Sequence, residues 1–216
     1  MFEEGRQAVA DGVDHLADLT PGRTGNLSVR SGDRVAITPT GVPYGEITPG
    51  SVPVIDLDGT ILAGDLEPSS EVPMHLGIYG GLEAGIVAGA IVHVHSPYAT
   101  TLSVLRQPVP PVHYMLALAG SRVPVAEYAT YGTQELAANV VAQLEEAETD
   151  ACLLANHGLV ALGEDAEDAI ETARAVESTA RVYVQAAGIG EPVKLSEAEM
   201  EQVGERFGSY GQSEQG

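Results

Sequence analysis

Residues 90–96 read Ala-Ile-Val-His-Val-His-Ser, an apolar run that holds two histidines two positions apart. A short apolar run of this kind is typical of a buried strand. Side chains at i and i+2 of a strand point to the same face, so His93 and His95 can direct two ring nitrogens at one point. We therefore expect a buried strand here that begins a metal site.

Two other segments supply the remaining donors for such a site. His157 stands between the apolar runs 151–155 and 159–162, where a strand-turn-strand would present it, and Glu71 follows a serine pair. Three neutral imidazoles with an open fourth position are typical of a catalytic zinc site, because structural zinc sites are usually closed by four ligands and rich in cysteine. The expected ligands are His93, His95 and His157.

The His-x-His pair has two other interpretations. In an apolar strand it is often only packing with one hydrogen bond. A cupin-type metal site also uses such a pair, but there a glutamate normally follows a few residues later. Here Ser96, Pro97 and Tyr98 follow, which makes the cupin interpretation weak.

Length and composition favour one domain spanning residues 1–216, since 216 residues with 44% hydrophobic content can bury a substantial core. The N-terminus lacks the order of a signal peptide, and no stretch approaches the roughly 18 apolar residues of a membrane helix. We expect a soluble, cytoplasmic protein. The single cysteine, Cys152, excludes an internal disulfide and a cysteine-based zinc site, and it is interpreted as a core residue.

The charge is strongly negative: 31 Asp and Glu against 10 Lys and Arg give −21. This imbalance disfavours nucleic acid and anionic membranes as partners, and it suits a protein whose self-repulsion is screened by strong salt. A halophilic host is the preferred explanation, and an ordinary acidic surface is the alternative.

The only lysine, Lys194, bears on mechanism. Carbon-carbon bond chemistry through a Schiff base needs a desolvated lysine with a lowered pKa. Lys194 lies in a connector just before an expected helix start, which is a poor place for that role. If the protein activates carbonyl groups, a metal must serve as the electron sink.

The expected elements form an α/β fold in layers, with helices on both faces of a largely antiparallel sheet. Helical spacing, caps and stop signals place helices at 3–19, 68–80, 97–105, 133–146 and 166–187, and a capping box at Ser196 starts a last one. Ser69 or Ser70 is expected to cap the second helix. Strands are expected at 27–30, 34–38, 52–56, 90–95 and 123–127, with a hairpin at 151–162.

With these motifs in place, the chain resembles the class II aldolase/adducin family, and most closely its L-fuculose-1-phosphate aldolase branch. The resemblance runs nearly end to end, and the joint order of its motifs is highly specific. Besides the histidines and Pro68 to Glu71, the motifs are the segments 24–30, 37–41, 113–115 and 128–133.

The resemblance implies a fold and a set of roles. His93, His95 and His157 would hold Zn²⁺, with Glu71 as acid/base, helped by a pKa that a dry pocket would raise. Tyr114 would reach from a neighbouring subunit of a homotetramer toward the aldehyde oxygen. The reaction would cleave L-fuculose 1-phosphate, or a related ketose 1-phosphate, to dihydroxyacetone phosphate and L-lactaldehyde through a metal-stabilised enediolate.

A phosphorylated sugar must bind locally to so acidic a protein. The positions that match the family's phosphate contacts are Asn26, Thr40, Gly41, Ser69 and Ser70, aided by backbone N–H groups at a helix start. Arg23 departs from the small residues of the familiar loop, so it either contacts phosphate or points to solvent. Tyr131 and the tail residue Tyr210 are further candidates, although a frayed terminus is the alternative for Tyr210.

Two other functions stay open. An L-ribulose-5-phosphate 4-epimerase-like enzyme of the same family is the first, favoured by Ser96 after His95, whereas the segments 113–115 and 128–133 favour the aldolase. An adducin-like protein without catalysis is the second, and its sign would be lost metal ligands. All three histidines and Glu71 are present.

Overall fold

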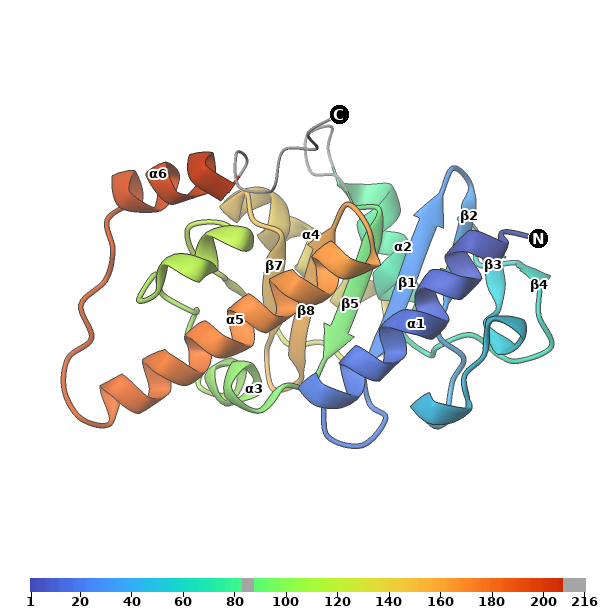
Figure 1. The fold of residues 1–216 in the computed structure, drawn as a ribbon, viewed down its shortest axis with the longest axis horizontal. Helices are drawn as coiled ribbons and strands as arrows, with labels where there is room; N and C mark the ends of the chain where they lie inside the picture. The colour runs from blue at the N-terminus through green and yellow to red at the C-terminus, as the bar shows by residue number, and fades with distance from the viewer. Residues whose placement is uncertain (83–87, 208–216) are drawn as a thin grey trace, which may run out of the picture.

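The computed structural model describes residues 1–82 and 88–207 (Figure 1). One eight-stranded sheet has the order β4-β3-β2-β1-β5-β8-β7-β6. Every neighbouring pair is antiparallel except β6 and β7. The strands are β1 Asn26–Ser31, β2 Arg34–Ile37, β3 Val54–Asp56, β4 Ile61–Ala63, β5 Ala90–Val94, β6 Val125–Ala126, β7 Ala151–Leu154 and β8 Gly158–Gly163.

Helices cover both faces of this sheet, which confirms the expected layered α/β/α arrangement. One face carries α1 (Glu3–Leu19), α3 (Pro97–Val104) and α5 (Ala166–Ala187), of which α1 and α5 run across the front of the sheet in Figure 1. The other face carries α2 (Val72–Gly81) and α4 (Gln134–Ala147). The last helix, α6 (Glu197–Phe207), packs near the 3₁₀ segment Tyr114–Leu118.

Alternation along β5 decides which side of the sheet can carry chemistry. Val92 and Val94 pack in the core under α1 and α5, whereas Ile91 packs in the core under α2. Successive strand side chains point to opposite faces, so His93 shares the α2 side with Ile91. The α2 side is therefore the side on which the expected metal ligands can meet.

Several element boundaries differ from the predictions. Helix α2 begins at Val72, not at Pro68, and Glu71 is its N-cap residue. The expected serine cap is therefore wrong in detail: Ser69 Oγ accepts a hydrogen bond from the Glu71 N–H at 3.3 Å, one turn before the helix proper. The short edge strand β4 was not predicted, because its three residues are too few to show an alternating pattern.

Local signals at two helix starts have identifiable partners. The predicted capping box is confirmed, since Ser196 Oγ accepts from the Glu199 N–H and the Glu199 carboxylate accepts from the Ser196 N–H. The start of α3 is capped from α5: the N–H groups of Tyr98 and Ala99 donate to Glu177 at 3.0 and 2.8 Å. This cap holds the start of α3 against α5.

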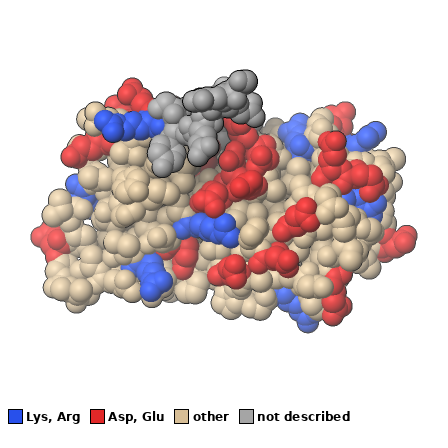
Figure 2. Space-filling view, in the orientation of Figure 1, with Lys and Arg blue, Asp and Glu red and all other residues tan. Residues whose placement is uncertain are grey.

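The surface and the core agree with the composition. Figure 2 shows acidic side chains spread over the face that carries α1 and α5, with fewer basic ones between them. Cys152 is buried in β7, and burial raises the pKa of its thiol to about 12, as suits a core residue. Lys194 is exposed on the connector before α6. Within the described part of the chain, no helix combines the length and the apolar character needed to cross a membrane.

Candidate active site

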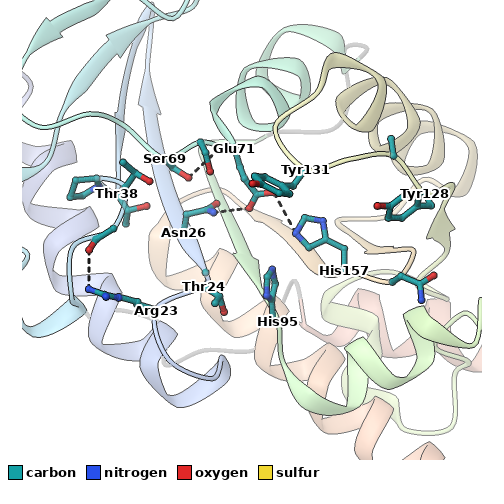
Figure 3. Close-up of a pocket in the computed structure, with 17 residues that line it drawn as sticks. Arg23, Thr24, Asn26, Thr38, Ser69, Glu71, His95, Tyr128, Tyr131 and His157 are labelled. Carbon is teal, nitrogen blue, oxygen red and sulfur yellow. Dashed lines mark hydrogen bonds and ion pairs between the residues drawn. The ribbon is translucent and has the colours of Figure 1, made fainter.

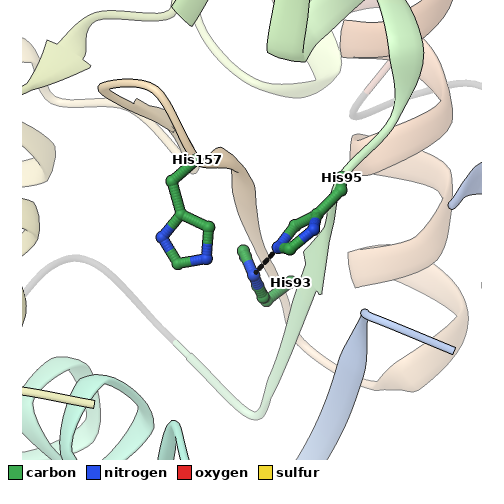
Figure 4. Close-up of side chains that lie close together, drawn as sticks. All are labelled: His93, His95 and His157. Atoms are coloured by element: carbon green, nitrogen blue, oxygen red, sulfur yellow. Dashed lines mark hydrogen bonds between the residues drawn. The ribbon is translucent and has the colours of Figure 1, made fainter. Parts of the chain in front are cut away.

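The three histidines meet at one end of the sheet, as Figure 4 shows. His93 and His95 come from the end of β5, and His157 comes from the turn between β7 and β8. Their rings lie 4.8 to 4.9 Å apart in edge-on pairs, and one nitrogen from each lies within 4.8 Å of the others. The predicted triad is therefore assembled.

Backbone geometry at the β7–β8 turn brings His157 into place. Asn156 adopts a left-handed conformation with φ 53°, which asparagine tolerates better than most residues. A Cβ on Gly158 would lie 2.5 Å from the Val94 carbonyl oxygen and 2.9 Å from a ring carbon of His95. Only glycine lets the turn approach β5 this closely.

Hydrogen bonding and burial prepare the ring nitrogens as ligands. His93 Nδ1 donates to the Leu159 carbonyl oxygen at 2.9 Å, which leaves Nε2 with its lone pair toward the centre of the cluster. Burial is the main cause that lowers the pKa of both His95 and His157 to about 4. Both rings are therefore neutral near pH 7, which is the form that binds a metal ion.

Glu71 completes the cluster from the start of α2. Its Oε2 lies 3.0 Å from His93 Nε2 and accepts a hydrogen bond from Asn26 Nδ2 at 3.0 Å. Its Oε1 lies 3.5 Å from His157 Nε2 and, among the described residues, has no hydrogen-bond partner although it is buried. A buried carboxylate oxygen without a partner is rare and points to a missing cation or substrate group.

The pKa of Glu71 is lowered, not raised as expected from a dry pocket. Burial does raise the pKa of this carboxyl group, but the neighbouring His93 and His157 and the Asn26 amide together hold it below its ordinary value. Glu71 is thus a carboxylate beside the three rings. Three imidazole nitrogens and one carboxylate suit a divalent metal ion.

A cavity of about 400 Å³ opens beside the cluster (Figure 3). Its wall combines loops from both halves of the sheet, and His95, His157 and Glu71 lie at its inner end. The remaining lining residues are Arg23, Thr24, Gly25, Asn26, Thr38, Pro39, Thr40, Gly41, Ser69, Ser70, Tyr128, Ala129, Tyr131 and Asn156.

The predicted phosphate-binding residues lie together because two loops pair. The Thr40 N–H donates to the Glu67 carbonyl oxygen, and the Ser69 N–H donates to the Thr38 carbonyl oxygen, at 2.9 and 3.0 Å. Arg23 then reaches across, and its Nη1 donates to the Gly41 carbonyl oxygen at 2.9 Å. Arg23 is the only arginine or lysine among the described residues of this wall, and it is also exposed to solvent, so it lines the cavity at its open side.

Two predicted residues that the structure describes do not line the cavity. His93 is fully buried behind it. Tyr114 lies on the 3₁₀ segment, is 49% exposed and has its ring near those of His113 and Phe207. Tyr210 falls outside the described residues.

Sequence reasoning missed Tyr128, Asn156, Thr24 and Thr38 as lining residues. Tyr128 stands in the recognised segment 128–133, and Asn156 directly precedes His157, so neighbourhood to a motif was the available signal. Ser96, which favoured an epimerase, is fully buried and lies outside the lining.

Known proteins similar to this chain share its length and fold. Residues 13–184 match the family described as Class II Aldolase and Adducin N-terminal domain. A 5-deoxy-D-ribulose 1-phosphate aldolase of Bacillus thuringiensis is 40% identical over 97% of this chain and 98% of its own. The L-fuculose phosphate aldolase of Escherichia coli K12 is 40% identical over 89% and 88%. A solved L-fuculose 1-phosphate aldolase has a TM-score of 0.89 at 42% identity, over 95% and 96% of the two chains.

Proposed function

Since the chain belongs to the class II aldolase and adducin family, whose similar members are named aldolases, we propose that it cleaves a ketose 1-phosphate to dihydroxyacetone phosphate and an aldehyde. The observation that carries this proposal is the cluster of His93, His95 and His157 beside Glu71, at one side of a cavity whose other wall suits an anion. The substrates named for two similar proteins, 5-deoxy-D-ribulose 1-phosphate and L-fuculose 1-phosphate, share the 1-phosphate and differ in the part that leaves as aldehyde.

We assign the ligand role to His93, His95 and His157, and Zn²⁺ is the proposed ion because imidazole nitrogens are borderline-soft donors that suit it. A bound divalent ion supplies Lewis-acid stabilisation to oxygen atoms that gain negative charge when the carbon-carbon bond breaks. The rings orient that chemistry: the Leu159 carbonyl oxygen fixes the tautomer of His93, and the Gly158 turn fixes His157.

Glu71 is the proposed acid/base. It exchanges a proton with the substrate carbon through Oε1, because Oε2 already accepts the hydrogen bond from Asn26. Its low pKa in the cluster keeps it ionised and ready to accept a proton during aldol addition. In the cleavage direction Glu71 must first take up a proton, which the same oxygen then gives to the carbon; the proton that the substrate hydroxyl loses as the aldehyde forms balances it.

The phosphate subsite is proposed at the opposite wall of the cavity. Ser69 and Ser70 hydroxyls precede α2, Thr40 and Gly41 lie on the paired loop, and Arg23 adds the charge that this acidic protein otherwise lacks there. Asn26 donates one amide N–H to Glu71, and its second N–H is available toward the substrate. Tyr131 lies 65% exposed at the rim and is proposed to contact the aldehyde half.

The substrate assignment is tested by following free dihydroxyacetone phosphate with glycerol-3-phosphate dehydrogenase and NADH. L-fuculose 1-phosphate and 5-deoxyribulose 1-phosphate are compared in the same metal-loaded sample. Oxidation of NADH with either substrate supports the proposal, and the larger kcat/KM identifies the aldehyde. Silence with both, together with conversion of L-ribulose 5-phosphate to its 4-epimer, would replace the aldolase by the epimerase.

Tyr114 is proposed to act in the active site of a neighbouring subunit of a homotetramer. Tyr114 is half exposed and does not line the cavity of its own chain, which supports a role in the site of another chain. Mixing two inactive variants tests this: Glu71→Gln subunits mixed with Tyr114→Phe subunits should regain activity, because mixed oligomers contain some sites with both native residues. No recovery in a verified mixed oligomer would place Tyr114 outside the reaction.

A further inference from the structure

A row of buried polar side chains lies next to the candidate active site, between β1 and α2. Asn26 and Ser28 are two positions apart on β1, whereas Glu71, His75 and Tyr79 follow one another at intervals of four along the start and length of α2. Two strand residues advance about 6.7 Å and four helix residues about 6 Å, so the two rows keep step and interlock.

The interlocked rows form one continuous chain of contacts. Glu71 Oε2 accepts from Asn26 Nδ2 at 3.0 Å, and Asn26 Oδ1 lies 2.5 Å from His75 Nε2. His75 Nδ1 lies 2.7 Å from Ser28 Oγ, which lies 2.8 Å from the Tyr79 hydroxyl. All five side chains are buried, and His75 and Ser28 are fully so.

The hydrogen bonds in this chain can run in only one direction while Glu71 is ionised. A carboxylate only accepts, which turns Asn26 Nδ2 toward Glu71 and Oδ1 toward His75. His75 must then donate from Nε2. Burial lowers the pKa of His75 to about 3, so the neutral ring carries no second N–H and its Nδ1 accepts from Ser28. Ser28 has a single hydroxyl hydrogen, so it accepts in turn from Tyr79.

This chain conveys orientation and not protons. A proton moving along it would have to pass through the Asn26 amide, which neither gains nor loses a proton readily near neutral pH. What reaches Glu71 is instead a fixed amide N–H. If the donor at His75 Nε2 were lost, the Asn26 amide would be free to turn, and its oxygen would face the Glu71 carboxylate.

We propose that His75 is a positioning residue for Glu71: held in its Nε2–H tautomer by Ser28 and Tyr79, it fixes the Asn26 amide, which occupies Oε2 and leaves Oε1 for the substrate. This inference rests on the proposed function, in which Glu71 exchanges the substrate proton. Its tests therefore include one that needs no turnover.

The first test reads the tautomer directly. In ¹⁵N-labelled metal-free protein, long-range nitrogen–proton correlation of the histidine rings should show His75 protonated at Nε2 alone between pH 6 and 8. The His75→Gln variant assigns the signal by its loss. An Nδ1–H tautomer or a doubly protonated ring at His75 is incompatible with the proposed direction of these hydrogen bonds. Either result would overturn the proposal, whatever the enzyme's substrate proves to be.

The second test measures turnover. His75→Leu, which has no donor, should lower kcat by about 10- to 100-fold with KM and bound metal unchanged. His75→Gln should recover most of that loss, because a glutamine amide can donate to Asn26 and accept from Ser28. In an Asn26→Ala background, His75→Leu should lower kcat by less than about twofold more, since the path to Glu71 is already cut.

Each outcome decides. An equal loss in both backgrounds would show that His75 does not act through Asn26, and a lower melting temperature with unchanged kcat would make the row purely structural. If His75→Leu does not fold, Ser28→Ala replaces it, with Ser103→Ala as control; Ser103 is equally buried but donates within its own helix. If wild type cleaves no ketose 1-phosphate, the proposed function fails. The measured tautomer of His75 then decides by itself whether the Asn26 amide is oriented as proposed.

Discussion

The face of the sheet under α1, α3 and α5 buries only apolar and hydroxyl side chains from these helices, whereas the face under α2 and α4 buries ionisable ones. The buried polar residues of α3 and α5 are Ser103, Thr172 and Thr179. On the opposite face, Glu71, His75 and His93 are buried together with Asn26 and Ser28.

This difference has an energetic meaning. Burying an ionisable group costs free energy unless hydrogen bonds or a counter-charge compensate it. The face under α2 meets that cost with the Glu71–His75 row, and it still leaves Glu71 Oε1 without a described partner. Burial of apolar side chains on the other face offsets this cost for the fold as a whole. Such a division is expected when function and stability compete.

The largest effect is expected from substituting adjacent β5 residues that point to opposite faces. His93→Ala removes a proposed ligand, so bound metal and turnover should both be lost while the fold remains. Val92→Ala, the matched control, should retain metal and lower the free energy of unfolding by about 1–3 kcal/mol. Metal analysis, activity and urea unfolding measure both variants. Full activity in a metal-free His93→Ala protein would contradict the site.

The second effect separates proton transfer from ligation. Glu71→Gln keeps the size of the side chain but removes the proton acceptor, so turnover should fall by about 10²-fold or more with bound metal largely retained. The control on the apolar face is Glu177→Gln, which should weaken the cap of α3 by about 1 kcal/mol and leave turnover unchanged. Parallel loss of metal and turnover in Glu71→Gln would make Glu71 mainly a ligand.

The two faces also differ in what the sequence could predict. His93, His95 and the β7–β8 hairpin follow from strand alternation and apolar runs, so the triad was predictable from local pattern. The role of His75 was not, because it depends on the pairing of β1 with β5 and on where α2 begins. A helix that began at Pro68 would place Glu71 inside its first turn. In the structure Glu71 is the N-cap residue, and His75 and Tyr79 follow it at intervals of four.

The residues of the proposed anion subsite were named for a different reason. Family resemblance marked Thr40, Gly41 and Ser69, but no local pattern shows that the loops 38–41 and 67–70 pair with each other. The sequence could not show whether Arg23 points to solvent or to phosphate, because the direction of its side chain depends on a hydrogen bond to the Gly41 carbonyl oxygen. Contacts between distant loops are set by tertiary packing, which a single sequence does not display.

A smaller effect is expected at this loop-built end of the polar face. Arg23→Met removes a charge-assisted contact, so KM for a ketose 1-phosphate should rise by about tenfold while kcat changes little. The Ki for inorganic phosphate should rise in parallel. Arg122→Met, at an exposed arginine outside the cavity, is the control. Unchanged KM and Ki in Arg23→Met would show that this guanidinium only fastens the loop.

The smallest effect concerns acid stability, to which the buried His75 contributes on the polar face. Folding holds the pKa of His75 at about 3, chiefly through burial and partly through His93, with Glu71 opposing, whereas the unfolded chain takes up this proton near pH 6.5. The unfolded state therefore binds more protons between those values, and the free energy of unfolding falls as the pH falls through that window. His75→Gln removes the group that takes up this proton, so the stability of the variant should decline less steeply from pH 6.5 downward, by at most about 1.4 kcal/mol per pH unit.

Because His95 and His157 remain in both proteins, the difference between the urea-unfolding series of wild type and His75→Gln isolates His75. His15→Gln, which removes an exposed histidine of α1, is the matched control. Parallel curves for wild type and His75→Gln would show that the row takes up a proton at His75 as readily as the unfolded chain does, and the contrast between the two faces would lose its electrostatic basis.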